Sequence, residues 1–377
     1  MTPNQEMKQI IIIDASSLSL GGGLTHLIEF LKESLNGDYF FEIICSDLIA
    51  DKISTFKNVK IKTHPFLNKT IFHRFFFQLV LIDELINFKA KALLSLTGDY
   101  LGKFRPFLGI CQNMLLYERN KLEGMGVLLS AKFLILKYRQ VYCFNRSNGV
   151  IFLSKHAKNV VYPLIKKNSL MIINFGISER FIKSNKLESN IIPSRFLYVS
   201  SIHTYKNQLN LVLAFKNLIQ SGIDLKLTLV GPILNYDYWR KVKQEIDKVN
   251  KESVLIDYVS FIDYNEIHNV YNNSEIFIFP SLCENMPNIL LEAMKSNIPI
   301  LSSNLDPMPE FLKDYAVYFN PIDIKSIQES IYYSLSNYNE LKKNASRAFV
   351  DMNNYTWKKN YNETINFIEK ISNSYER

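Results

Sequence analysis

The chain is predicted to form an α/β protein with two Rossmann-like, doubly wound domains that face each other across a cleft. Its 377 residues are enough for two hydrophobic cores. Short apolar runs typical of buried strands alternate with helical patterns, which indicates parallel sheets covered on both faces. The polar stretch 181–193 separates two such alternations, and we place the linker there.

The first domain is predicted to cover residues 1–185. It opens with the strand Gln9–Asp14 and a glycine loop. Apolar runs predict further strands at 40–45, 59–63, 92–96, 108–111, 149–153 and 171–174. Apolar periodicity predicts helices at 24–35, 72–88 and 125–146.

The second domain is predicted to cover residues 191–355. Strands are expected at 196–200, 225–231, 254–259, 276–279 and 298–302. Helices are expected at 207–221, 236–250, 265–272, 288–296, 323–337 and 355–371. The segment 356–377, which holds most of the last helix, is predicted to pack back on the first domain.

Composition excludes several classes of protein. Hydrophobic residues make up 47% and charged residues 21%, as in folded globular proteins. No uncharged apolar run reaches the roughly 18 residues of a membrane span, and no signal peptide is visible, so we expect a cytoplasmic protein. Four cysteines without C-x-x-C spacing predict buried thiols, not a zinc or disulfide framework: Cys45, Cys111, Cys143 and Cys283.

Positive charge is concentrated in the first half. Residues 52–186 hold 23 Lys and Arg against 6 Asp and Glu, interleaved with aromatic residues at 72–77 and 132–139. One interpretation is a set of amphipathic helices with basic solvent faces. The other is a surface that docks on anionic lipid head groups, where each basic residue contributes roughly 1 kcal/mol. Without an RNA-binding motif or zinc-finger spacing, we do not expect nucleic acid as a partner.

Two carboxylates flank a strand-to-helix junction. Glu284 follows the buried strand 276–279, and Glu292 lies about one turn into the helix that starts after Pro287. Between them lie the N–H groups of a helix N-terminus, which favour phosphate. Each carboxylate can accept hydrogen bonds from a pair of sugar hydroxyls. The spacing therefore predicts a nucleotide-sugar site.

Two further motifs suit an anionic ligand. Gly21, Gly22 and Gly23 precede the first helix and let a backbone approach a ligand closely, although a plain surface loop fits equally well. Lys206 follows the first strand of the second domain, where a cation can stabilise a departing diphosphate. Alone it is more often structural or solvent-facing, so its role depends on the glutamate pair.

Together these motifs resemble glycosyltransferase family 4, a family of retaining, nucleotide-sugar-dependent enzymes with the GT-B fold. Glu284 and Glu292 match the family's E-x7-E element, and Lys206 matches its basic position. The glycine loop, the Asn-x-Gly segment at 172–177 and the Pro-Glu turn at 309–310 match as well. Two positions depart from the family pattern: Ser201 stands where an Arg is frequent, and Gln112 where a His is frequent.

The resemblance implies the following roles. Lys206 stabilises the leaving diphosphate, Glu284 binds the donor sugar, and Glu292 holds the ribose hydroxyls. Gly22 and Gly23 close over the phosphates from the other domain. Backbone N–H groups are expected to bind the same phosphates from Asn288, Ile289 and Leu290. The side chains expected to contact the sugar or acceptor are Gln112 and Asn113.

The predicted activity is that of a hexosyltransferase-like enzyme. Without an Asp-x-Asp motif, no metal or other cofactor is expected. The preferred acceptor is a lipid-linked saccharide of a bacterial surface polysaccharide, such as O-antigen (lipopolysaccharide) or capsule. The protein would then be peripheral on the inner face of the cytoplasmic membrane. Alternatives are a soluble or protein acceptor, a non-catalytic nucleotide-sugar-binding protein, and an oxidoreductase with two Rossmann-like halves, against which the missing G-x-G-x-x-G motif argues.

Overall fold

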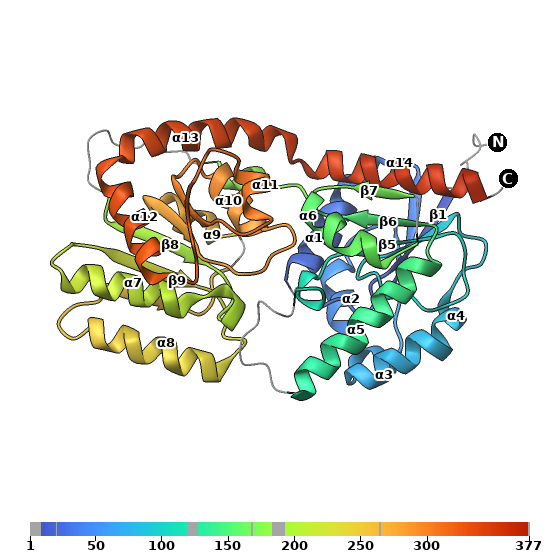
Figure 1. Ribbon diagram of the computed structural model, residues 1–377. Helices are drawn as coiled ribbons and strands as arrows, with labels where there is room; N and C mark the ends of the chain where they lie inside the picture. The colour runs from blue at the N-terminus through green and yellow to red at the C-terminus, as the bar shows by residue number, and fades with distance from the viewer. Residues whose placement is uncertain are drawn as a thin grey trace. The chain divides into compact units, whose positions relative to one another are not determined.

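The computed structural model describes residues 9–19, 21–118, 127–166, 169–182, 193–263 and 265–375. These residues form two compact units, and each unit is built on a parallel sheet (Figure 1). Unit 1 takes the described residues before Glu118, those from 127 to 176, and those from 356 onward. Unit 2 takes Glu118 and residues 177–355. The two parallel α/β sheets confirm the predicted fold class.

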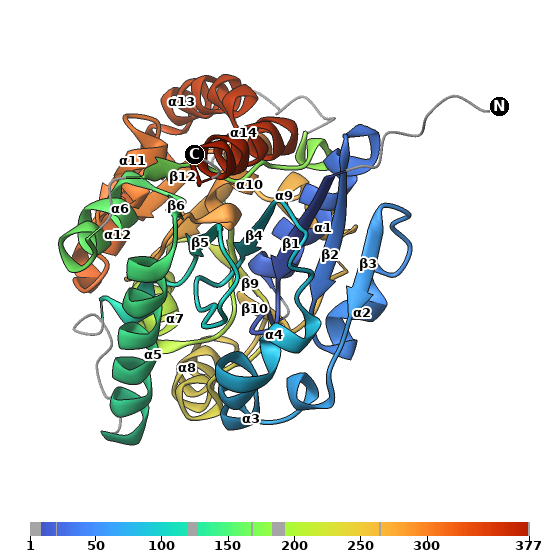
Figure 2. The same cartoon turned by 90° about the vertical axis from the view of Figure 1, so that its right-hand side faces the viewer.

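The described residues of unit 1 form a seven-stranded sheet in the order β3-β2-β1-β4-β5-β6-β7. Figure 2 shows β1 between β2 and β4. The sequence places strands here because its apolar runs are buried on both faces, as in β4 and β5, where every residue is buried. The strands are β1 (Gln9–Asp14), β2 (Tyr39–Ile44), β3 (Val59–Lys62), β4 (Ala92–Ser95), β5 (Phe107–Cys111), β6 (Gly149–Phe152) and β7 (Leu170–Ile172).

The helix expected over 72–88 is divided in the structure. It consists of α3 (Ile71–Phe76), a π turn (Phe77–Leu81) and α4 (Ile82–Leu85). The wider turn lets the consecutive residues Phe77 and Gln78 both be fully buried. The other helices of unit 1 are α1 (Gly22–Glu33), α2 (Asp47–Ile53), α5 (Val127–Arg146), α6 (Lys155–Val161) and α14 (Trp357–Tyr375).

The C-terminal helix α14 belongs to unit 1 although it lies at the far end of the chain. The Tyr361 ring packs 5.0 Å from Phe30 of α1, and Asn360 Nδ2 donates to the Asn174 carbonyl at 2.8 Å. A Cβ on Gly176 would lie 2.1 Å from the backbone nitrogen of Trp357, so glycine is required where the two segments cross. The chain enters unit 2 directly after this glycine, not at the expected linker, most of which lies outside the described residues.

The described residues of unit 2 form a six-stranded sheet in the order β10-β9-β8-β11-β12-β13. Its strands are β8 (Arg195–Val199), β9 (Lys226–Val230), β10 (Ile256–Val259), β11 (Ile276–Phe279), β12 (Ile300–Ser303) and β13 (Val317–Phe319). Its helices are α7 (Gln208–Gln220), α8 (Tyr236–Val249), α9 (Ile267–Asn272), α10 (Asn288–Lys295), α11 (Met308–Leu312), α12 (Ile324–Ser336) and α13 (Tyr338–Asp351). The core of the sheet includes β11, whose four residues are all buried.

The four cysteines are all buried thiols, and none forms a disulfide. Among the helices that the structure describes, none combines the length and the apolar character needed to cross a bilayer.

Candidate active site

Lys206 and Glu284 lie at the carboxyl edge of the unit 2 sheet. Lys206 follows β8 and Glu284 follows β11, and these two strands are neighbours. The strand order reverses between them, because β9 and β10 extend to one side and β12 and β13 to the other. In open α/β sheets, ligands bind beyond the carboxyl ends of the strands at such a reversal. The topology therefore brings both predicted residues to the expected ligand edge.

The backbone around Lys206 is firmly held. Lys206 ends a short 3₁₀ turn, Thr204–Lys206, and its carbonyl accepts a hydrogen bond from the Tyr198 hydroxyl at 2.8 Å. The next residue, Asn207, has a left-handed φ of 61° and its side chain donates to the Pro321 carbonyl at 2.6 Å. The turn therefore fixes the direction in which the lysine side chain leaves the backbone.

Lys206 and Glu284 form a nearly buried ion pair. Lys206 is 8% exposed, and its Nζ donates to Glu284 Oε1 at 2.5 Å. Burial acts to lower the pKa of Lys206, but the Glu284 carboxylate, together with Tyr205 and Cys283, acts to raise it, and the net effect is a raised pKa. Lys206 is therefore a secure cation at the point where the strand order reverses.

Glu284 accepts a second hydrogen bond on the same oxygen. The Ser281 hydroxyl donates to Glu284 Oε1 at 2.6 Å. Its other oxygen, Oε2, takes part in neither contact, and 12% of the side chain is exposed. The carboxylate is thus oriented by Lys206 and Ser281 and keeps acceptor capacity for hydroxyl groups.

The backbone N–H groups at the start of α10 have more hydrogen-bond partners than the sequence indicated. The Asn288 N–H donates to the Met286 carbonyl at 3.0 Å, and the Leu290 N–H donates to the Pro287 carbonyl at 2.9 Å. Two of the three N–H groups predicted to bind the phosphates therefore already have backbone partners. For Ile289 no such backbone bond is found among the described residues. Pro287 is the residue before the helix and not its first residue. The phosphate-binding role of this turn stays a prediction.

Glu292 lies on α10 with its carboxyl group in a buried environment. The Tyr271 hydroxyl of α9 donates to Glu292 Oε2 at 2.9 Å, and Glu292 is 9% exposed. Burial raises the pKa of Glu292 to about 7, although Tyr271 and Arg180 act to lower it. Near neutral pH this group changes its charge readily, and a ligand that donates hydrogen bonds to it would favour the carboxylate.

Gly22, Gly23 and Gln112 come together in unit 1. Gly21 caps α1 with a φ of 117°, and Gly22 and Gly23 form its first turn. A Cβ on Gly23 would lie 3.0 Å from Gln112 Oε1 and 2.7 Å from Leu18 Cδ1, so a larger residue there would displace the Leu18 side chain. The helix N-terminus and the Gln112 amide are therefore neighbours.

Asn113 has a local structural role. It is exposed, and its Oδ1 accepts a hydrogen bond from the Leu115 backbone N–H at 3.0 Å, which caps the following 3₁₀ turn. Contact of Gln112 and Asn113 with a sugar stays a prediction.

His26 lies next to Gln112, and the sequence analysis did not single it out. Gln112 Nε2 is 3.4 Å from His26 Nδ1. The His26 ring packs 4.4 Å from Phe175 and 6.0 Å from Trp357, and burial lowers its pKa to about 4. His26 is therefore neutral at pH 7. The feature that could have identified His26 from the sequence is its position on the buried side of α1.

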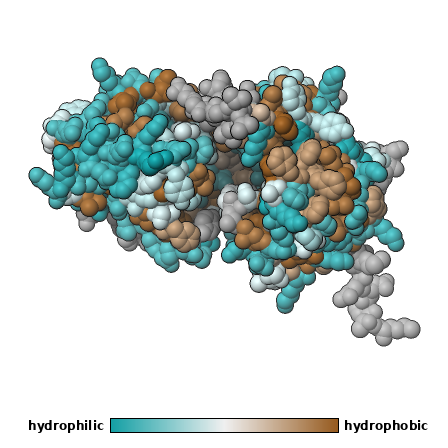
Figure 3. Space-filling model, turned by 90° about the horizontal axis from the view of Figure 1, so that it is seen from below, coloured by the Kyte–Doolittle hydropathy of each residue, from teal (hydrophilic) through white to brown (hydrophobic). Residues whose placement is uncertain are grey.

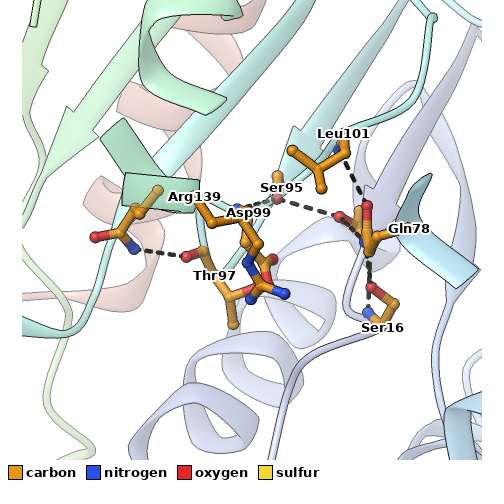
Figure 4. Close-up of polar contacts among 9 residues, drawn as sticks. Ser16, Gln78, Ser95, Thr97, Asp99, Leu101 and Arg139 are labelled. Atoms are coloured by element: carbon orange, nitrogen blue, oxygen red, sulfur yellow. Dashed lines mark hydrogen bonds and ion pairs between the residues drawn. The ribbon is translucent and has the colours of Figure 1, made fainter. Parts of the chain in front are cut away.

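A second charged cluster, also missed, lies at the carboxyl edge of the unit 1 sheet (Figure 4). Asp14 ends β1 and is fully buried. Gln78 Nε2 donates to its Oδ1 at 3.2 Å and its Oδ2 at 3.0 Å, and the Ser95 hydroxyl donates to Oδ2 at 3.2 Å. Burial, assisted by the charge of Asp99, raises the pKa of Asp14 to about 6. An acidic residue directly after four isoleucines was the available sequence signal.

Asp99 forms the other half of this cluster. The Thr97 hydroxyl donates to Asp99 Oδ1 at 2.5 Å, and the Arg139 guanidinium of α5 pairs with Oδ2. Gln78 Oε1 accepts from the Leu101 backbone N–H at 3.1 Å. Both carboxylates are therefore occupied by groups of unit 1 itself. The cluster fastens α5 and the π turn to the sheet.

Among the described residues, no group of three or more His, Cys, Asp or Glu side chains is placed to hold a metal ion. Metal-independent activity stays a prediction.

Comparison with known proteins agrees with this geometry. Residues 179–349 match the model of the family described as glycosyl transferases group 1. This region is therefore similar to the group 1 glycosyl transferases. It contains Lys206, Glu284 and Glu292, so the whole candidate site of unit 2 lies within the matched region.

Curated relatives match about half of the chain. The capsular polysaccharide biosynthesis glycosyltransferase CapM of Staphylococcus aureus is 25% identical over 187 residues, which are 46% of this chain and 48% of CapM. The O-antigen chain mannosyltransferase B of Escherichia coli is 24% identical over 173 residues, 45% of this chain and 44% of that protein. The chain thus spans about half the length of the curated relatives it matches.

The likeness to solved structures extends over the whole chain. HepE from Anabaena, in complex with UDP and glucose, has a TM-score of 0.72 with 14% identity, and the match covers 98% of this chain and 99% of that one. At this identity the likeness shows the fold alone. The fold is GT-B, as the resemblance implied.

Proposed function

We propose that this protein is a retaining glycosyltransferase of family 4 that moves a sugar from a nucleotide-diphosphate sugar to a lipid-linked saccharide. The Lys206–Glu284 pair at the strand-order reversal carries the proposal, because it joins a buried cation to an oriented acceptor at the ligand edge. The family match of residues 179–349 supports the reaction class.

In the proposed mechanism Lys206 receives the negative charge of the leaving diphosphate. The ion pair with Glu284 keeps the ammonium group protonated and in place before the donor binds. When the diphosphate arrives, Lys206 acquires a second anionic partner, and the attraction grows as the glycosidic bond breaks. Glu284 stays held by Ser281 and accepts hydrogen bonds from sugar hydroxyls through Oε2.

Glu292 binds the ribose in this proposal. Tyr271 uses one carboxylate oxygen, Oε2, which leaves Oε1 for the hydroxyl groups of the nucleotide. Ribose hydroxyls donate to the ionised form and so favour loss of the proton from Glu292. The N–H group of Ile289, together with Gly22 and Gly23 at the start of α1, would contact the phosphates.

Retention of configuration would need no separate general base. The departing phosphate oxygen takes the proton of the acceptor hydroxyl as the new glycosidic bond forms on the same face of the sugar. Lys206 then neutralises the phosphate that remains. This is consistent with a site built from a cation and hydroxyl-binding carboxylates, and it requires no metal ion.

The acceptor proposal depends on the relatives and on charge. CapM is named for capsular polysaccharide biosynthesis, and the Escherichia coli relative is named an O-antigen chain mannosyltransferase. We extend that acceptor class, a growing bacterial surface polysaccharide on a lipid carrier, to this chain. The excess of basic residues at 52–186 supports a position on an anionic inner-membrane surface.

A panel of nucleotide-sugars tests the donor. Each compound is added at increasing concentration, and the melting temperature is measured for the wild type and Glu292→Ala. The true donor should raise the melting temperature in proportion to the logarithm of its concentration over the dissociation constant. Glu292→Ala should weaken the response to every sugar that carries the same nucleotide. A wild type that responds to none would overturn the proposal.

Turnover separates an enzyme from a binding protein. Slow hydrolysis of the bound donor without acceptor, measured by release of nucleotide, supports catalysis, whereas binding without any release supports the non-catalytic alternative. A chelator should leave the rate unchanged. Transfer to soluble oligosaccharides or to protein at the rate seen with lipid-linked acceptor would favour the alternative acceptors.

A further inference from the structure

Unit 1 carries two helical stripes of exposed apolar side chains. On α3 and the π turn, Phe72 is 80%, Phe76 48% and Val80 56% exposed, at a spacing of four residues. On α5, Ile135 is 61%, Tyr138 67% and Tyr142 57% exposed, at spacings of three and four residues. Each set therefore lies along one face of its helix.

α5 and the π turn also have a buried, inward face. The inward face of α5 buries Gln140, Cys143 and Phe144, and the π turn buries Phe77 and Gln78. An amphipathic helix on a protein surface normally turns charged residues outward. Here aromatic and branched side chains lie on the outward face instead, and gatherings of exposed apolar side chains on a protein surface mark interaction sites.

The two stripes belong to one surface. Figures 1 and 2 show α3 and α5 on the same side of unit 1, and the Arg139 guanidinium of α5 lies 5.8 Å from the centre of the Phe75 ring of α3. Figure 3 views the molecule from that side and shows apolar residues gathered on unit 1. We call the outward faces of α3, the π turn and α5 the docking surface.

The segments that carry the docking surface are basic. Residues 69–82 and 127–146 contain six Lys and Arg and no Asp or Glu, although Arg139 is paired with Asp99 on the inward side. Lys69 and Lys132, which are both exposed, flank the apolar stripes. Cationic side chains next to exposed aromatic ones are the combination that binds the head groups and the outer acyl region of an anionic bilayer.

The same helices are anchored to the sheet from behind. Gln78 of the π turn donates to Asp14, and Arg139 of α5 pairs with Asp99 (Figure 4). The first contact is buried and the second is largely buried, and together they hold the helices of the docking surface on the unit 1 sheet. A surface that is held in place before it binds loses less conformational entropy on binding.

We propose that the docking surface seats unit 1 on an anionic lipid bilayer. A second copy of the chain fits less well, because a two-fold contact would bring the same positive surfaces together. The inference deepens the proposed function, since it names the surface that would hold the enzyme beside a lipid-linked acceptor. It does not depend on the donor chemistry of unit 2.

Vesicle flotation tests the docking surface. Wild-type protein is mixed with vesicles of phosphatidylglycerol and phosphatidylethanolamine, or of phosphatidylcholine alone. We expect binding to the anionic vesicles only, and weaker binding as salt is added. The double variant Lys69→Ala/Lys132→Ala should bind about fivefold more weakly for each charge removed. Phe72→Ser/Tyr138→Ser should lose most of the binding.

Matched controls come from unit 2. Phe261→Ser removes an aromatic side chain that is 76% exposed, and Lys241→Ala removes an exposed lysine. Both should bind as the wild type does. Equal flotation of the docking-surface variants and the controls would overturn the proposal, as would equal binding of the wild type to neutral vesicles. Dimerisation in solution that Phe72→Ser/Tyr138→Ser abolishes, without lipid binding, would assign the surface to a second copy instead.

A measurement of donor binding distinguishes failure of the docking surface from failure of the proposed function. The docking-surface variants should retain the melting-temperature response to the nucleotide-sugar, because Lys206, Glu284 and Glu292 belong to the other unit. Loss of flotation with an intact donor response supports the docking surface. Intact flotation in a protein that binds no nucleotide-sugar would instead overturn the donor chemistry alone.

Discussion

Unit 1 and unit 2 each gather buried charged side chains where the strand order of a parallel sheet reverses, but the two clusters are occupied differently. In unit 1, Asp14 and Asp99 are occupied by side chains of their own unit, chiefly Gln78 and Arg139. In unit 2, the contacts of Glu284 with Lys206 and Ser281 use only Oε1, and Glu284 is the carboxylate partner of Lys206 among the residues that the structure describes. The same topology thus supports a closed structural cluster in one unit and a site suited to a ligand in the other.

The largest expected effect concerns the closed cluster. Arg139→Ala leaves the Asp99 carboxylate buried without its cation, which should lower the free energy of unfolding by roughly 3–5 kcal/mol. Urea unfolding measures it. The matched control is Arg240→Ala, whose ion pair with Asp237 is exposed and should contribute less than about 1 kcal/mol. Similar stability of the two variants would contradict a structural role for the cluster.

The next effect concerns the site in unit 2. Lys206→Ala should lower turnover by about 100-fold or more, because the leaving diphosphate loses its cation. Steady-state rates with the identified donor measure it. Lys216→Ala is the control, since Lys216 also pairs with a glutamate, Glu245, but on helices α7 and α8. Full activity of Lys206→Ala would show that Lys206 does not stabilise the leaving diphosphate. The charged cluster of unit 2 would then be structural, like the cluster of unit 1.

A smaller effect follows from the titration of Glu292. The pKa is about 7 without ligand, and the ribose hydroxyls require the carboxylate, so nucleotide affinity should fall about tenfold from pH 8 to pH 6 and be constant above pH 8. Calorimetric titration across this range measures it. Glu292→Gln should bind weakly with a flat profile, whereas Glu245→Gln should keep the wild-type profile. A flat wild-type profile would show that Glu292 does not contact the nucleotide.

Much of the fold follows from local sequence. Strands such as β1 and β11 are found within the predicted limits, because a strand buried on both faces is a continuous apolar run between polar residues. Lys206 and Glu284 were predictable for a related reason: loops that follow neighbouring parallel strands meet at one edge. The interruption of 72–88 by a π turn was not predictable, because it depends on the burial of Gln78 against Asp14, which are 64 residues apart.

One unpredicted contact of the candidate site also depends on distant residues, whereas other differences are local. The Lys206–Glu284 hydrogen bond joins residues 78 positions apart, and the sequence indicated their proximity but not that they pair with each other. The engagement of the Asn288 and Leu290 N–H groups depends on the local geometry around Pro287. The helix α13 was missed because polar and charged residues predominate in it, although Tyr338, Leu341, Ala345 and Ala348 are buried.

The position of α14 has a consequence for biosynthesis. Unit 1 is completed by residues 357–375, whose side chains cover Phe30 and the strand that begins at Gly149. The ribosome releases these residues after those of unit 2, so the earlier residues of unit 1 remain without this helix until unit 2 has been synthesised. Unit 2 is nearly continuous in sequence and is the first able to close its core. A nascent chain that stops before Trp357 would expose the apolar surface around Phe30 and the strand that begins at Gly149. It would then become a substrate for chaperones or proteases.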